Sequence, residues 1–188
     1  MDSNNINNNN GRGGNLNKLV FAALIMGMIL IATSFFRIPV PMTQGYVNLG
    51  DAVIFLGVLL LGRKYGAVAA GLGASLGDVL GGYAFFAPWT FLIKFAMAFV
   101  CGLIIEAAVK KSHGQAGKKA DVLAMTVGGL VMVAGYLIVE IPMYGNAATA
   151  LAEVPWNICQ FIVGECVALA IGAALSKTPA KRYFALPM

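Results

Sequence analysis

Four ionisable side chains lie inside long apolar stretches of this sequence, where each needs a physical reason to be present. They are Asp78, Lys94, Glu140 and Glu165. A charged side chain at the centre of a membrane-spanning helix costs about 2.5–3.5 kcal/mol on insertion scales, so such residues are functional by default. Two interpretations are open. The four converge on a polar cavity, or they form interhelical salt bridges, for example between Lys94 and Asp78.

Aromatic and amide side chains occur at the same level of the predicted spans. Small-molecule pockets are lined mostly by apolar and aromatic groups, with a few polar groups that fix the ligand. We therefore expect these side chains to join the four charged ones around an outward-facing cavity. Taken singly, the aromatic residues also suit anchors at the membrane interface. The candidates are Tyr46, Asn48, Tyr83, Trp89, Tyr144 and Asn157.

Groupings typical of catalysis or metal binding are missing from the sequence. The chain has one histidine, His113, and three cysteines without CxxC spacing, which argues against a metal site or a disulfide framework. The glycine-containing run at 57–64 lacks the Ser or Thr and the preceding strand of a phosphate-binding loop. No nucleophile and base are grouped as an enzyme would need. We expect no catalytic residue, no metal and no cofactor.

The composition identifies the class of protein that must position these residues. Of 188 residues, 59% are hydrophobic and only 11% are charged, and the mean hydropathy is +0.79. Soluble domains carry roughly a quarter charged residues. The apolar residues form long runs rather than alternating, which excludes an outer-membrane barrel. The fold class is therefore predicted to be all-α, a polytopic membrane protein.

Hydropathy predicts six transmembrane helices, of which the second and third are short and glycine-rich. Short, interrupted spans are typical of transporter binding sites, because they leave backbone and loop around a cavity. The membrane domain covers residues 18–176, between a disordered Asn/Gly-rich tail at 1–17 and a basic tail at 177–188. The predicted spans are 18–36, 51–62, 66–80, 88–109, 121–141 and 156–175.

Basic residues predict the orientation of the chain. With the N-terminus in the cytoplasm, nearly all lysines and arginines outside the spans fall on the inner side, and only Arg37 falls outside. We expect a multi-pass protein of the cell membrane, surrounded by lipid, with both termini cytoplasmic. The net charge of +5 reflects this topology and does not indicate nucleic acid.

Small residues recur at every fourth position in two predicted spans. Ala23 and Gly27 do so in the first span, and Gly73 and Gly77 in the third. Such stripes let helices approach closely in a membrane. They indicate either packing within the bundle or a docking face for another membrane protein.

Four motifs carry a resemblance to a known family over about residues 19 to 105. The chain resembles the S components, the substrate-binding membrane subunits, of energy-coupling factor (ECF) vitamin transporters, and is most similar to the riboflavin-transporter-like branch. The motifs are YVNLGDAVIFLG at 46–57, LLLGRKYGA at 59–67, GLGASLGDVLGGY at 71–83 and APWTFLIK at 87–94.

The resemblance implies how such a protein works and with what it assembles. It implies six helices that capture a vitamin near the outer face, with the loop at about 37–49 as a lid over the pocket. The partners would be a transmembrane coupling protein and two cytoplasmic ATPases, and ATP hydrolysis would topple the component in the bilayer. Ala23 and Gly27, and less directly Gly73 and Gly77, would contact the coupling protein.

The expected pocket chemistry suits a small flat heterocycle with hydroxyl groups or an amine. Hydroxymethylpyrimidine, a thiamine precursor, or pyridoxine would fit. The family branch favours riboflavin, and pantothenate would use Lys94 for its carboxylate. Two other classes of function remain open, an autonomous ion-coupled carrier and a membrane scaffold without a ligand.

Overall fold

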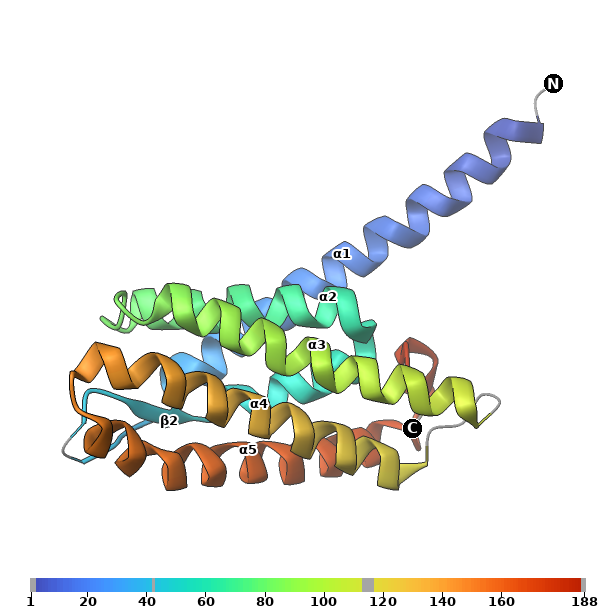
Figure 1. Ribbon diagram of the computed structural model, residues 1–188. Coiled ribbons are helices and arrows are strands. Elements are labelled where there is room, and N and C mark those ends of the chain that lie inside the picture. Colours follow the sequence, from blue (N-terminus) through green and yellow to red (C-terminus); the bar gives the residue numbers. More distant parts are fainter. Residues whose placement is uncertain (1–2, 42, 113–116, 187–188) are drawn as a thin grey trace.

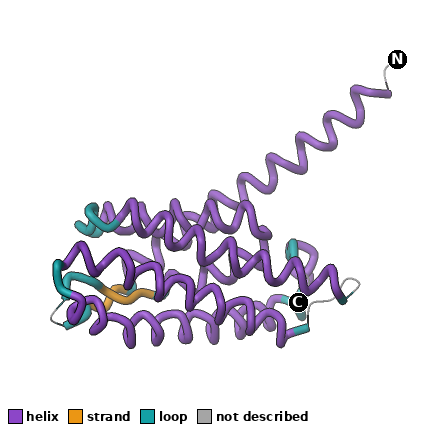
Figure 2. The backbone as a smooth tube through the Cα atoms, in the orientation of Figure 1, coloured by secondary structure: helices purple, strands orange, loops and turns teal. Residues whose placement is uncertain are grey.

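The chain is almost entirely helical apart from one short antiparallel hairpin (Figures 1 and 2). The computed structural model describes residues 3–41, 43–112 and 117–186, so His113 lies outside the described residues. The elements are α1 (Ser3–Phe35), β1 (Arg37–Pro39), β2 (Tyr46–Asn48), α2 (Gly50–Leu80), α3 (Ala87–Lys111), α4 (Lys118–Tyr144), α5 (Ala147–Leu175) and the 3-10 helix η1 (Pro179–Tyr183).

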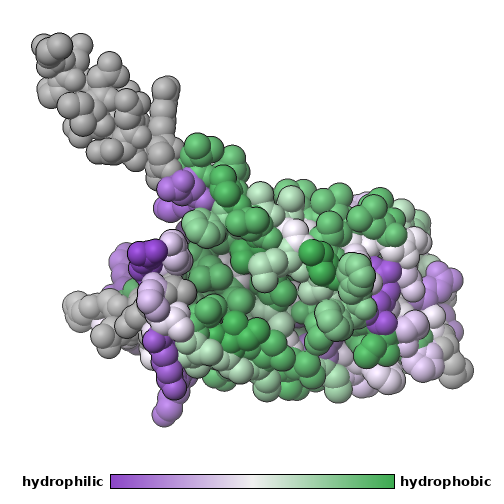
Figure 3. Space-filling model, turned by 180° about the vertical axis from the view of Figure 1, so that it is seen from behind, coloured by the Kyte–Doolittle hydropathy of each residue, from purple (hydrophilic) through white to green (hydrophobic). Residues whose placement is uncertain are grey.

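Five helices of the described chain are long and apolar enough to cross a membrane. A helix satisfies its own backbone hydrogen bonds, which the hydrocarbon core of a bilayer demands. The outer surface carries large apolar side chains such as Leu24, Ile31 and Leu130. The face drawn in Figure 3 is mostly hydrophobic, with more polar residues toward its two ends. The multi-pass helical membrane fold is therefore confirmed.

The region predicted as two short helices is a single element, α2, with a sharp break at Gly62. Gly62 has φ 74° and ψ 179°, values outside the helical range that suit a residue without a side chain. The break brings Gly66 against Val58, because a Cβ on Gly66 would lie 3.0 Å from the Val58 Cα. In a straight helix, residues eight apart are about 12 Å apart. Whether the two arms of α2 are separate spans, which would make six, stays a prediction.

Helix α5 begins nine residues before the predicted start at 156. Gly145, with φ 62°, ends α4, and the Asn146 side chain then caps α5 by accepting a hydrogen bond from the Ala148 N–H at 2.9 Å. Pro155, which directly precedes the predicted start, lies inside the helix. The earlier start places Glu153 within a membrane helix rather than in a loop.

The two chain ends differ in how they relate to the bundle. The first half of α1 projects away from the other helices (Figure 1), and a disordered tail at 1–17 stays a prediction. The C-terminal segment instead packs back on α2, where the Ala185 and Leu186 N–H groups donate to the Leu60 and Leu59 carbonyls at 3.2 and 3.1 Å. The break at Gly62 deprives these carbonyls of their helical donors, so the segment caps the first arm of α2.

Gly73 and Gly77, the two α2 glycines expected to contact a partner protein, are buried within the bundle. A Cβ on Gly73 would lie 2.7 Å from the Met26 carbonyl oxygen, and one on Gly77 would lie 2.8 Å from the Thr33 side chain. Both glycines therefore let α1 and α2 pack closely, which is a role within the bundle. Gly27 differs, because a Cβ there would meet no described atom within 4 Å.

Candidate functional site

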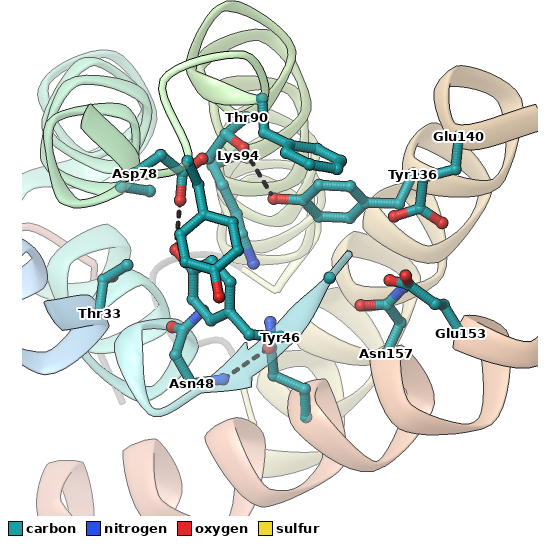
Figure 4. Close-up of a pocket in the computed structure, with 15 residues that line it drawn as sticks. Thr33, Tyr46, Asn48, Asp78, Thr90, Lys94, Tyr136, Glu140, Glu153 and Asn157 are labelled. Carbon is teal, nitrogen blue, oxygen red and sulfur yellow. Dashed lines mark hydrogen bonds between the residues drawn. The ribbon is translucent and has the colours of Figure 1, made fainter. Parts of the chain in front are cut away.

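A narrow cavity lies near the β1–β2 hairpin, at the opposite end of the bundle from the two termini (Figures 1 and 4). It has room for about 30 Å³ of water-sized spheres, which corresponds to two or three water molecules. Its walls come from every described helix of the bundle and from the hairpin. The lining residues are Thr33, Gly45, Tyr46, Asn48, Ala74, Asp78, Tyr83, Phe86, Thr90, Lys94, Tyr136, Glu140, Glu153, Asn157 and Gln160.

The structure brings seven of the ten predicted ligand residues to this cavity. These seven are Tyr46, Asn48, Asp78, Tyr83, Lys94, Glu140 and Asn157.

The other three predicted residues do not line it. Trp89 is 42% exposed on the outside of α3, as an interfacial anchor would be. Tyr144 does not line the cavity, but its hydroxyl donates a hydrogen bond at 2.7 Å to Glu153, which does. Glu165 lies about 7.5 Å further along α5 than Gln160 and accepts hydrogen bonds from Thr126 at 3.1 and 3.3 Å.

Lys94 forms a buried ion pair with Asp51 on the first arm of α2, and not with Asp78. The two side chains are 2% and 0% exposed. The Lys94 Nζ also contacts the Met132 sulfur at 2.8 Å, and the Gln160 amide donates to the other Asp51 oxygen at 2.8 Å. Lys94 therefore reaches the cavity wall with its charge already neutralised. The sequence placed Asp51 only at a helix start, and the break in α2 positions it in the core.

The hairpin covers the cavity through specific contacts. The Tyr46 hydroxyl donates to Asp78 on α2, and the Asn48 backbone N–H donates to the Gln160 side chain at 2.8 Å. Burial, together with the neighbouring Asp78 carboxylate, raises the pKa of Tyr46 above its ordinary value, so its hydroxyl stays a donor. At the hairpin base, the Arg37 guanidinium lies 4.3 Å from the Tyr46 ring centroid and donates to the Gly77 carbonyl at 3.0 Å.

Several lining residues were not predicted, although their spacing offered a signal. Glu153, Asn157 and Gln160 share one face of α5 at i, i+4 and i+7. Thr90 precedes Lys94 by four residues on α3, and Tyr136 precedes Glu140 by four on α4. The Tyr136 hydroxyl donates to Thr90 at 3.3 Å, as Figure 4 shows. A helical wheel centred on Lys94, Glu140 and Asn157 would have found them.

This arrangement suits reversible binding of a small molecule. Aromatic rings provide flat apolar surface, and buried polar groups provide directional hydrogen bonds. The fold defines a multi-pass helical membrane protein, and the cavity is its candidate site for a small ligand.

Comparison with known proteins identifies the family within that class. A sequence model of the ECF-type riboflavin transporter S component matches residues 14–177. The chain belongs to this family of transporter S components, which are not enzymes.

The chain is also similar to two curated proteins, one of which is named as a transporter. A protein of Lactococcus lactis subsp. cremoris described as the thiamine precursor transporter HmpT is 27% identical over 165 residues, 87% of this chain and 90% of its own length. An uncharacterised protein of Pyrococcus woesei is 34% identical over 149 residues, 79% of this chain and 95% of its own length.

Solved structures show the same fold at 18% sequence identity. The biotin S component of an ECF-type ABC transporter matches with a TM-score of 0.70, over 98% of this chain and 100% of that one. The S component of a bacterial ECF transporter matches with a TM-score of 0.66, over 87% of this chain and 97% of that one.

Proposed function

We propose that this chain is the substrate-binding S component of an ATP-driven ECF importer and that it captures a small water-soluble vitamin or vitamin precursor. The observation that carries the proposal is the cavity beneath the hairpin, lined by aromatic and buried polar side chains.

Hydroxymethylpyrimidine and pyridoxine are the preferred ligands. Both are small and flat, which suits a narrow cavity with aromatic rings in its walls. The name of the Lactococcus relative supports the pyrimidine, which is a thiamine precursor. Riboflavin is the second candidate because of the family's name, but its larger ring system demands a wider opening. Pantothenate loses support, since Lys94 is already paired with Asp51.

The hairpin is the proposed lid of the site. Gly45, Tyr46 and Asn48 all line the cavity, and their contacts to α2 and α5 close it. Opening breaks the hydrogen bond from Tyr46 to Asp78 and that from Asn48 to Gln160, so the hairpin exposes the cavity without unfolding the bundle. Ligand contacts would then favour the closed state.

The transport step is proposed to use the whole bundle as the moving unit. The arms of α2, residues 50–61 and 63–80, are about 18 and 27 Å long and would count as the second and third of six spans. The complex would contain a transmembrane coupling protein and two cytoplasmic ATPases. Ala23 is exposed and Gly27 is open on the same face of α1, which supports this face as the contact for the coupling protein.

The proposed orientation places the cavity outside and both termini in the cytoplasm. In Figure 1 the C-terminal end of α3 and the N-terminal end of α4 lie at the end of the bundle away from the hairpin. These helix ends carry Lys110 and Lys118, and Arg63 pairs with Glu106 near the end of α3. The positive-inside rule assigns such an end to the cytoplasm of the cell membrane.

The test combines ligand identification with reconstitution. The full chain is purified in mild detergent, bound compounds are identified by mass spectrometry, and uptake is measured in liposomes with and without the coupling protein and ATPases. We expect a retained vitamin and uptake that requires ATP and the partner subunits. Uptake by the pure chain under an ion gradient would instead establish an autonomous carrier. A chain that binds none of the candidate vitamins would be a scaffold.

A further inference from the structure

Two carboxyl groups lie next to each other in the wall of the cavity, and one of their oxygens has no hydrogen-bond partner among the described residues. Glu140 on α4 and Glu153 on α5 point toward one another in Figure 4, and they are 2% and 3% exposed. Glu153 accepts a hydrogen bond from the Tyr144 hydroxyl at 2.7 Å. The Glu140 Oε2 atom has no partner among the described residues. A buried acceptor without a donor is costly, so a ligand that brings a donor to this position would be favoured.

The described basic side chains do not neutralise this pair. Lys94, which also lines the cavity, is held by Asp51. Arg37 donates to the Gly77 and Gly81 carbonyls at the end of α2. Of the ion pairs among the described residues, neither includes Glu140 or Glu153. Two carboxylates at one buried site require a positive charge, a proton or several N–H donors.

We propose that Glu140 and Glu153 select a ligand with an amino-substituted, protonatable nitrogen heterocycle. This inference rests on the proposed function and names the chemical class of its ligand. In a 4-aminopyrimidine, the ring nitrogen next to the amino-bearing carbon can hold a proton, and its N–H then lies parallel to an amino N–H. These two donors match the two oxygens of one carboxylate, as the guanidinium of arginine does. The second amino N–H remains for the other carboxylate.

The same pair disfavours the other candidates. The carboxylate of pantothenate would be repelled by Glu140 and Glu153 in this buried site, because Lys94 is already paired with Asp51. Pyridoxine offers hydroxyl donors but lacks the paired N–H edge. In riboflavin the single ring N–H that could approach a carboxylate lies between two carbonyl oxygens, and those would face the carboxylates unfavourably. The carboxylate pair therefore separates ligands that size and aromaticity alone do not.

The test compares two probes that differ at one group. These are 4-amino-5-hydroxymethyl-2-methylpyrimidine and its analogue with oxygen in place of the amino group, measured by isothermal titration calorimetry with the full-length protein in detergent. We expect the amino compound to bind at least about tenfold more tightly, because charge-assisted hydrogen bonds are roughly twice as strong as neutral ones. Equal affinity for the two probes would overturn the inference, and this comparison requires no variant.

Variants then assign the preference to the pair. E140Q and E153Q are each expected to weaken binding of the amino compound by about 10- to 100-fold and to reduce its advantage over the oxygen analogue. E165Q is the matched control, since Glu165 lies on α5 outside the cavity and bonds Thr126; it should bind like wild type. Unchanged affinity in E140Q and E153Q would remove the assignment.

The result also separates this inference from the function on which it rests. Tight binding of riboflavin or pantothenate, with the amino compound bound weakly, would overturn the inference and leave a vitamin-binding S component. If a folded protein bound neither the amino compound nor pyridoxine, riboflavin or pantothenate, the proposed function itself would be overturned.

Discussion

The Lys94 ammonium and the Asp51 carboxylate form an ion pair in the middle of the bundle, joining α3 to the first arm of α2. This relationship makes Lys94 a structural residue at the edge of the site rather than a free cation for a ligand. It also explains why Asp51, at the start of an apolar helix, is fully buried.

Removing one partner of this pair should destabilise the protein more than removing both. K94M leaves an uncompensated buried carboxylate and is expected to cost about 3–5 kcal/mol, whereas K94M combined with D51N should recover most of the loss. Thermal unfolding in detergent measures the effect, and K110M, at an exposed position of the same helix, is the control. Equal unfolding temperatures for K94M and wild type would contradict the pairing.

A side chain at Gly45 should hinder closure of the hairpin. A Cβ built on Gly45 would overlap the Glu153 carboxylate. In G45A the hairpin can therefore close only if the Glu153 side chain moves. We expect faster ligand dissociation and about tenfold weaker binding, followed by stopped-flow tryptophan fluorescence. G117A, where the new methyl group meets no described atom within 4 Å, should behave like wild type. The lid assignment is lost if both variants release ligand at the wild-type rate.

Deletion of the C-terminal segment should weaken the first arm of α2. Removing residues 178–188 takes away the donors to the Leu59 and Leu60 carbonyls and the buried Leu186 side chain. Two hydrogen bonds at about 1 kcal/mol each and one buried leucine at about 1.5–3 kcal/mol predict a clearly lower unfolding temperature. L186S should show part of the effect, while R182A, at an exposed side chain, should show little. A truncated chain as stable as the full one would refute the capping role.

Two glycines of similar sequence context should respond differently to leucine. G73L places a side chain against the α1 backbone and is expected to disrupt folding, because its Cβ alone would lie 2.7 Å from the Met26 carbonyl oxygen. G27L adds a side chain in open space and should fold and bind ligand.

Because Gly27 is proposed to contact the coupling protein, G27L should lose assembly with the ECF module. Size-exclusion chromatography of the co-expressed subunits and ligand binding by the isolated chain measure the two properties. If G27L assembles normally, this face of α1 is not the docking surface.

The apolar runs, the glycine motifs and the polar residues within and beside them were sufficient to predict a helical membrane protein of the S-component family and seven of the residues that line the cavity. These features are local, because a bilayer demands helices and penalises each buried charge separately. Hence Asp78, Lys94 and Glu140 stood out in the sequence, and all three line the cavity.

Only the tertiary structure decided which charges meet. Lys94 pairs with Asp51 because the break at Gly62 returns the chain against itself, and Glu153 faces Glu140 because α5 begins at Ala147. Such pairings depend on the angle and register between helices distant in sequence, and these are set by close packing rather than by hydropathy, for example of Gly164 against Asp51 and of Gly129 against Phe161. For this reason the sequence predicted a cavity with charged walls, while the fold determined which of those charges remain for a ligand.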